Sequence, residues 1–233
     1  MNSIEFFPSL FKYLSIGLGL LMMVWALLNR PHISSKLSFL ICLCVAIIIG
    51  LVPEDSSVCL YDRPRYMYLF LVGEDRTSIK DIGFLLYVRL CRLFLGENYK
   101  LFFVFSAFIY TYGYYYFCKT IGSNSERTYP VLFIGCLLSM GFMNYGVNTM
   151  RSGMALSAFL TGYSFFLKKE KYSPYIMMII SGLIHVSMLL PIAAFFLSRC
   201  NIKIQWYYLL WLLFFIVSAF NLAGPITSAV ESL

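Results

Sequence analysis

The sequence predicts an all-α fold: a polytopic integral membrane helical bundle of about seven transmembrane helices plus one interfacial amphipathic helix. Of its 233 residues, 60% are hydrophobic and 12% are charged, whereas soluble domains carry about 25% charged residues. The mean hydropathy is +0.77. Apolar runs follow one another along the chain, and the alternation typical of membrane strands is missing between them. We therefore expect one integral membrane domain, residues 1–233.

Seven apolar runs are predicted to cross the membrane as helices. The first is followed by a basic loop and by no small-residue cleavage site, which favours a membrane span over a signal peptide. The seven runs cover residues 13–28, 37–52, 101–118, 129–144, 151–167, 175–197 and 206–222.

A long polar segment, residues 54–98, separates the second run from the third and contains a shorter apolar stretch. This stretch, Ile82–Leu95, is interrupted by Arg89 and Arg92 and is shorter than the ~17–25 residues that a spanning helix needs. We expect an amphipathic helix that lies in the membrane interface, with its arginines directed toward headgroups or substrate. A short buried span is the alternative.

The net charge of +7 lies in the short loops between apolar runs, which does not indicate nucleic-acid binding. If Ile82–Leu95 does not cross, the basic loops around residues 30–36, 119–127 and 168–171 all fall on one side of the membrane. The positive-inside rule then places them in the cytoplasm, and residues 54–98 on the outer face.

Cofactor and metal chemistry find no support in the sequence. The chain has seven cysteines, an odd number that argues against a disulfide framework. It contains no CxxC or HExxH motif and no nucleotide-binding glycine loop, so neither a metal nor a cofactor is expected.

Polar residues inside the last apolar runs predict a pocket in the membrane, because a bilayer tolerates ionisable side chains poorly. Asn148, Arg151 and Ser152 are spaced to share one helical face. His185 lies about 18 Å along the next helix, which Pro191 is expected to bend. Snorkelling of the arginine and a purely structural helix–helix hydrogen bond of the histidine are the alternatives.

Small residues follow this pocket along the chain. The pairs Gly153/Ser157 and Ala158/Gly162 have the small-xxx-small spacing that lets neighbouring helices approach closely.

The pattern Asn148-x-x-Arg151, a small-residue helix, a basic loop and then His185-x-Ser187 resembles the EpsG family, which belongs to the Wzy-like polysaccharide polymerases. Two earlier segments are also similar to the family: Asp62 with Tyr66, and Lys80-Asp81-Ile82-Gly83-Phe84. The family arginine is typically followed by Gln, where this chain has Ser152. Family members generally continue with further spans, so the resemblance implies a polymerase truncated at its C-terminus.

The resemblance implies polymerisation of lipid-linked oligosaccharide repeat units into exopolysaccharide, capsule or O-antigen, at the outer face of the bacterial cytoplasmic (inner) membrane. The donor would be an undecaprenyl diphosphate-linked oligosaccharide. Membrane lipids and other polysaccharide assembly proteins are the further partners implied, and nucleic acid is not among them.

This reaction assigns roles to the polar residues. His185 is the expected catalytic base and Asp62 the alternative, because histidine ordinarily titrates closest to neutral pH. Cationic side chains would neutralise the departing diphosphate. The residues expected to bind substrate are Arg151, Asn148, Arg63, Arg65, Tyr66 and Asp81.

Two other functions stay open. A non-enzymatic glycolipid transporter or exporter subunit would use the same arginines without needing His185. An intramembrane serine hydrolase would pair Ser152 with His185, but Met150-Arg151-Ser152-Gly153 lacks the leading glycine of the Gly-x-Ser-Gly motif.

Overall fold

The computed structural model describes residues 17, 35–53, 62–73, 79, 81–122, 128–200, 203–209 and 212. All regular secondary structure in these ranges is helical, which confirms the all-α prediction. The chain forms two compact units, residues 1–189 and 190–233. The single integral domain therefore stays a prediction.

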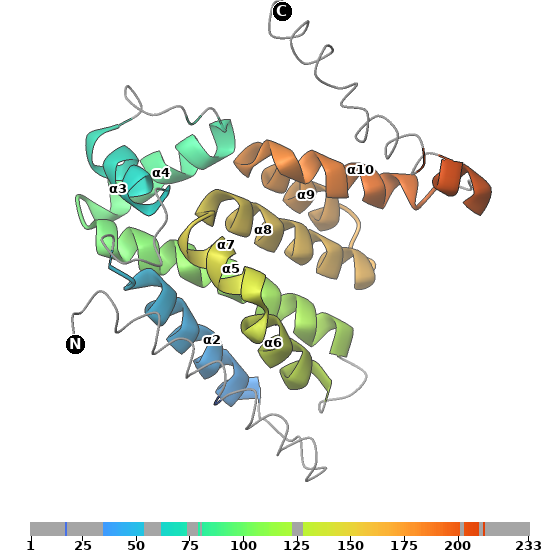
Figure 1. Cartoon of the computed structure of the whole chain (residues 1–233), viewed down its shortest axis with the longest axis horizontal. Helices are drawn as coiled ribbons and strands as arrows, with labels where there is room; N and C mark the ends of the chain where they lie inside the picture. Colours follow the sequence, from blue (N-terminus) through green and yellow to red (C-terminus); the bar gives the residue numbers. More distant parts are fainter. Residues whose placement is uncertain are drawn as a thin grey trace, which may run out of the picture. The chain divides into compact units, whose positions relative to one another are not determined.

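Helix α5 is the centre of the first unit (Figure 1). It runs from Tyr99 to Ile121 and packs against α2, α6 and α8. Asn98 caps its first turn by accepting a hydrogen bond from the backbone N–H of Leu101 at 3.1 Å. Among the residues that the structure describes, α5 is the one helix long and apolar enough to cross a membrane. The count of seven spans is therefore not confirmed.

Eight further α-helices have both ends within the described part of the chain. They are α2 (Ser35–Gly50), α3 (Asp62–Val72), α4 (Ile82–Leu95), α6 (Thr128–Leu138), α7 (Met140–Val147), α8 (Met150–Leu167), α9 (Ser173–Ile184) and α10 (Leu189–Leu197). The predicted spans 13–28 and 206–222 lie largely outside the described residues.

Two predicted continuous helices are broken. Ser139 is extended, with φ −65° and ψ 136°, and separates α6 from α7. His185 is also extended, at φ −155° and ψ 124°, and a short 3₁₀ helix (Val186–Met188) follows it. The bend expected at Pro191 was misplaced, because this proline lies in the first turn of α10, where no intrahelical N–H is required.

The segment between α2 and α5 contains two helices where one was predicted. The bounds of α4 are those predicted. Helix α3 was not predicted, although Tyr66, Leu69 and Phe70 have helical spacing and are buried.

Small residues bring α8 close to its neighbours, as predicted. A Cβ on Gly162 would lie 3.0 Å from the carbonyl oxygen of Pro174 at the start of α9. The Ser157 hydroxyl donates a 2.7 Å hydrogen bond to the carbonyl of Ile109 in α5. Both contacts need a small side chain on α8.

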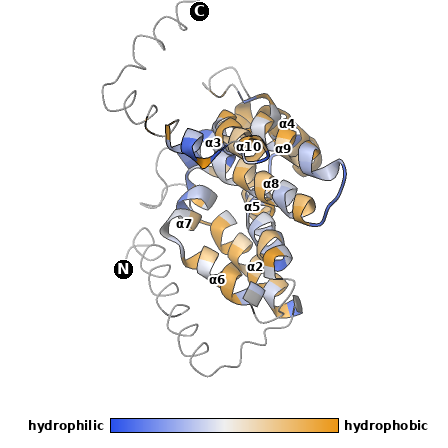
Figure 2. Cartoon of the chain, turned by 90° about the vertical axis from the view of Figure 1, so that its right-hand side faces the viewer, coloured by the Kyte–Doolittle hydropathy of each residue, from blue (hydrophilic) through white to orange (hydrophobic). Residues whose placement is uncertain are grey.

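Apolar residues make up much of several helices (Figure 2), and many of them are exposed. On α2 they include Leu40 and Ile47, and on α9 they include Ile176 and Ile179. Apolar surface of this extent is typical of proteins that face lipid.

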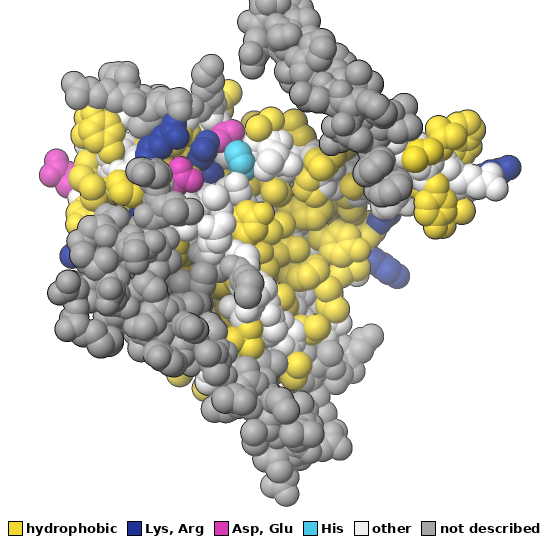
Figure 3. Space-filling model, viewed as in Figure 1, with side chains coloured by type: hydrophobic (Ala, Val, Ile, Leu, Met, Phe, Trp, Pro, Cys, Tyr) yellow, Lys and Arg dark blue, Asp and Glu magenta, His cyan; other side chains and the backbone are white. Residues whose placement is uncertain are grey.

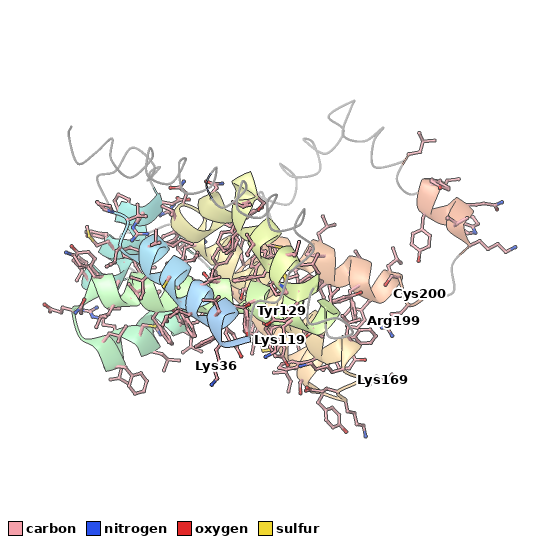
Figure 4. The ribbon with its side chains drawn as sticks, turned by 90° about the horizontal axis from the view of Figure 1, so that it is seen from below. Lys36, Lys119, Tyr129, Lys169, Arg199 and Cys200 are labelled. Carbon is pink, nitrogen blue, oxygen red and sulfur yellow. The ribbon has the colours of Figure 1, made fainter. Side chains whose placement is uncertain are left out.

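Basic residues gather at one end of the first unit (Figure 4). Phe39, near the start of α2, packs on Tyr115 of α5 at 6.0 Å between ring centres. Lys168, directly after α8, donates a 2.7 Å hydrogen bond to the hydroxyl of Tyr116. The segments that carry Lys36, Lys119 and Lys168 thus meet at one end, the arrangement that the predicted orientation requires.

Candidate functional site

Four side chains from four segments meet near the start of α4 and form what we call the Asp81 cluster: Tyr66, Asp81, Arg151 and His185. Arg151 donates from Nη1 to Oδ2 of Asp81 in an ion pair. Its Nε lies 3.4 Å from the hydroxyl of Tyr66. The Nδ1 atom of His185 lies 3.3 Å from the same Oδ2 of Asp81. The carboxylate therefore bridges the arginine and the histidine.

Two helix ends position the ion pair. Asp81 immediately precedes α4 with an extended backbone, φ −71° and ψ 102°, and its side chain makes no capping hydrogen bond. Its carboxylate is thus available to Arg151, which lies in the first turn of α8. Asp81 and Arg151 thus both lie at helix N-termini, where the helix dipoles of α4 and α8 have their positive ends.

The break after α9 places His185. The backbone N–H of His185 donates to the backbone carbonyl of Ser181 at 3.1 Å, as in a continuing helix. The backbone carbonyl of His185 accepts from the backbone N–H of Met188 at 3.0 Å. A proton on Nδ1 would be donated to Asp81, which leaves Nε2 as an acceptor for a substrate proton. This tautomer is the one that a general base requires.

Gly83 allows α4 to approach α9 at this point. A Cβ at residue 83 would come within 2.7 Å of the carbonyl carbon and oxygen of Leu183. Asp81 and His185 each lie two residues from this contact. Sequence reasoning assigned no role to Gly83, although the glycine stands in the segment that is similar to the family.

Tyr66 makes a second contact with the guanidinium of Arg151, through Nε. Its ring is buried, with 2% exposed, and packs edge-on against Phe84 at 5.5 Å between centroids. Burial raises the pKa of the Tyr66 hydroxyl, and the hydrogen bond from Arg151 partly opposes this shift. The neutral hydroxyl orients Arg151 without competing with Asp81 for its charge.

The cluster is partly accessible. The side chains of Arg151, Asp81 and His185 are 21%, 14% and 22% exposed. Basic, acidic and histidine side chains gather on the face seen in Figure 3. A charged ligand can therefore reach the cluster from this face.

Arg63 does not join the cluster. It is 1% exposed, and its Nη1 and Nη2 atoms donate to the carbonyls of Ile49 at 3.1 Å and Gly50 at 2.5 Å. Its Cζ lies 4.1 Å from the ring centre of Phe103. The guanidinium thus caps the C-terminus of α2, an arrangement that favours a structural role over the substrate contact expected for it.

Asn148 also has local partners. Its side-chain nitrogen donates to Oδ1 of Asn144 at 2.9 Å, and the residue is buried. Because α7 ends at Val147 and α8 begins at Met150, Asn148 and Arg151 do not share one continuous helical face. The prediction of a shared face was wrong.

Three other candidates, Asp62, Arg65 and Ser152, are not members of the Asp81 cluster. Asp62 begins α3, and its negative charge acts on the Tyr66 hydroxyl one turn later. Arg65 is half-buried on the same helix. Within the described ranges, no hydrogen bond reaches the Ser152 hydroxyl, and no group of three or more His, Cys, Asp or Glu side chains is arranged to hold a metal.

Comparison with known proteins gives one match. No curated protein and no solved structure matches the chain. The EpsG family model matches residues 38–233 and includes every residue of the Asp81 cluster. The chain therefore belongs to the EpsG family.

Proposed function

We propose that this protein polymerises lipid-linked oligosaccharide repeat units into exopolysaccharide, capsule or O-antigen at the outer face of the bacterial cytoplasmic membrane. Membership of the EpsG family, which is related to the Wzy-like polymerases, connects the chain with polysaccharide biosynthesis. The observation that carries the proposal is the bridging position of Asp81 between Arg151 and His185. Through Asp81 the site holds a general base, His185, next to a cation, Arg151.

In the proposed reaction, a hydroxyl of one lipid-linked repeat unit attacks the anomeric carbon of the growing glycan. Nε2 of His185 takes the hydroxyl proton, and Asp81 stabilises the resulting imidazolium through Nδ1. A new glycosidic C–O bond forms as the C–O bond to the diphosphate breaks. The diphosphate leaves with the bonding electron pair and remains attached to its lipid.

Arg151 supplies charge for the leaving group. Negative charge that develops on the departing diphosphate is stabilised by a preorganised guanidinium. The N-termini of α4 and α8 add partial positive charge at the same place. Because Asp81 occupies Nη1 of Arg151 and lies near Nδ1 of His185, a bound diphosphate would use other guanidinium hydrogens.

Asp62 is the second choice for the base. It lies at the start of α3, one turn before Tyr66. Unlike His185, it has no partner among the described residues that would orient it toward a substrate hydroxyl. The geometry therefore favours His185.

The test is chain lengthening by the purified full-length protein in lipid vesicles supplied with undecaprenyl diphosphate-linked repeat units. His185→Ala should lose about 10²–10⁴-fold in turnover while still binding the donor, because a general base acts mainly in the transition state. His32→Ala, at the only other histidine of the sequence, should keep full activity.

Other outcomes point elsewhere. Normal chain lengthening by folded His185→Ala protein would indicate that Asp62, and not His185, is the general base. Donor binding without any lengthening by the wild-type protein would favour the glycolipid transporter. Hydrolysis of peptide bonds would favour the serine hydrolase.

A further inference from the structure

A hollow lies between α4 and α5. It has a volume of about 400 Å³ and is lined by Leu90, Cys91, Phe94, Leu95 and Phe105. This volume falls within the range of about 300–1,000 Å³ found for ligand sites. Each of the five side chains is apolar, so the hollow suits a hydrocarbon chain and not a sugar or a phosphate.

An apolar stripe on α4 leads from the Asp81 cluster to this hollow. Ile82, Leu86 and Leu90 repeat every four residues and are 75%, 55% and 47% exposed, so they follow one face of the helix. The stripe begins at the residue after Asp81. Leu90 lies about 12 Å farther along the helix than Ile82.

The basic residues of α4 lie along one edge of this stripe. At about 100° per residue, Arg92 is turned away from Leu90 and Phe94, whereas Arg89, seven residues after Ile82, borders the start of the stripe. Both arginines are exposed. A helix with this pattern lies in the membrane interface with its basic side toward headgroups and its apolar side toward hydrocarbon. The stripe and the hollow would then face the region where lipid chains run.

We propose that the hollow holds the hydrocarbon chain of the same lipid-linked substrate whose diphosphate binds at the Asp81 cluster. This inference rests on the proposed function. The substrate chain is the favoured occupant because the stripe joins the hollow to a cationic side chain, Arg151, and a diphosphate carries more negative charge than the single phosphate of a bulk phospholipid. The protein would thus select its donor by chain length as well as by headgroup.

The experiment compares donors that carry the same sugar and diphosphate on an undecaprenyl or a dimethylallyl chain, which is too short to reach the hollow. The wild-type protein should show a KM at least about 10-fold lower for the undecaprenyl donor, and Leu90→Trp, which fills the hollow, should remove this advantage. The dimethylallyl KM and both kcat values should not change. Ile179→Trp is the matched control, because Ile179 on α9 is apolar and 62% exposed, and it should behave as wild type.

Phe94→Ala provides a second variant, because it removes a side chain that is 81% exposed and lines the hollow. It should weaken the chain-length preference in the same direction. An unchanged preference in Leu90→Trp and Phe94→Ala would overturn the inference while leaving the polymerase proposal intact.

A binding readout separates the two proposals. An undecaprenyl diphosphate with a photoactivatable diazirine on its chain should label peptides of α4 and α5 in the wild-type protein and not in Leu90→Trp. Labelling without chain lengthening would contradict the polymerase proposal alone. Labelling by a diazirine phosphatidylglycerol that excess undecaprenyl diphosphate does not displace would assign the hollow to membrane phospholipid and overturn the inference.

Discussion

Gly83 lies so close to Leu183 that a Cβ on the glycine would be 2.7 Å from the leucine carbonyl oxygen. Because the obstacle is backbone, Gly83→Ala must move α4 away from α9 and separate Asp81 from His185. We expect overpacking to lower the stability by about 1–3 kcal/mol and chain lengthening to fall by at least about 10-fold, which is equivalent to 1.4 kcal/mol in the barrier.

The control for this prediction is Gly135→Ala on α6, where an added Cβ meets no atom within 4 Å. It should keep wild-type activity and thermal midpoint. Thermal unfolding in detergent and a chain-length assay measure the two effects. Full activity in Gly83→Ala would show that the contact does not set the geometry of the Asp81 cluster.

Arg151→Lys should lose nearly as much activity as Arg151→Ala. The guanidinium contacts Asp81 through Nη1 and Tyr66 through Nε, and a single ammonium cannot reproduce both contacts in one plane. Tyr66→Phe removes one of them and should cost less, about 10-fold, as expected for a hydrogen bond to a charged group. Activity per folded molecule is the measurement. A lysine variant with most of the wild-type activity would favour snorkelling to the interface.

Asp81→Asn should reduce chain lengthening more than Asp62→Asn. The amide keeps the shape of the carboxylate but removes the charge that Arg151 and His185 share. We expect a loss of about 10²-fold or more, the usual effect of impairing a general base, with little change in donor binding. If Asp62→Asn shows the larger loss in turnover, Asp62 is the base.

Arg63→Met should destabilise the protein without a direct effect on the donor. The substitution removes two hydrogen bonds from a charged, buried donor to the end of α2, each typically worth about 1.5–3 kcal/mol. The thermal midpoint should fall and the KM for the donor should stay unchanged. Arg65→Met on the same helix is the control for the thermal midpoint alone, because Arg65 stays a candidate for substrate binding. A raised KM at an unchanged midpoint would restore the substrate-binding role for Arg63.

Membrane orientation can be tested by cysteine labelling in a background without native cysteines. Glu97 follows α4 and Lys169 follows α8, and both residues are exposed. An impermeant maleimide should label Glu97→Cys in intact cells, whereas Lys169→Cys should react only after the cells are opened. The reverse pattern would place the Asp81 cluster on the cytoplasmic side.

Some of this architecture could be predicted from local sequence. The bounds of α4 could be predicted because Asp81 directly precedes the helix and Gly96 directly follows it. Gly96 has a positive φ of 60°, which glycine adopts readily at the end of a helix. Helix α3 was missed because its charged beginning resembles a loop, although Tyr66, Leu69 and Phe70 carried the helical spacing.

Other features depend on distant partners. Arginine is rarely fully buried, and the partners of Arg63 are backbone carbonyls 14 and 13 residues earlier, which no side-chain pattern marks. The bridging role of Asp81 depends on residues 70 and 104 positions later. Arg151, His185 and Asp81 could be named as candidates, but their contact could not be predicted.

The separation between Asp81 and Arg151 has a consequence for biogenesis. Seventy residues must be synthesised after Asp81 before its arginine partner exists, which takes about 4–14 s at typical translation rates. During that interval the Asp81 carboxylate has no Arg151 to pair with while the nascent chain is inserted. Its place at the end of a helix, instead of in the middle of a span, lets water solvate the charge until the partner arrives.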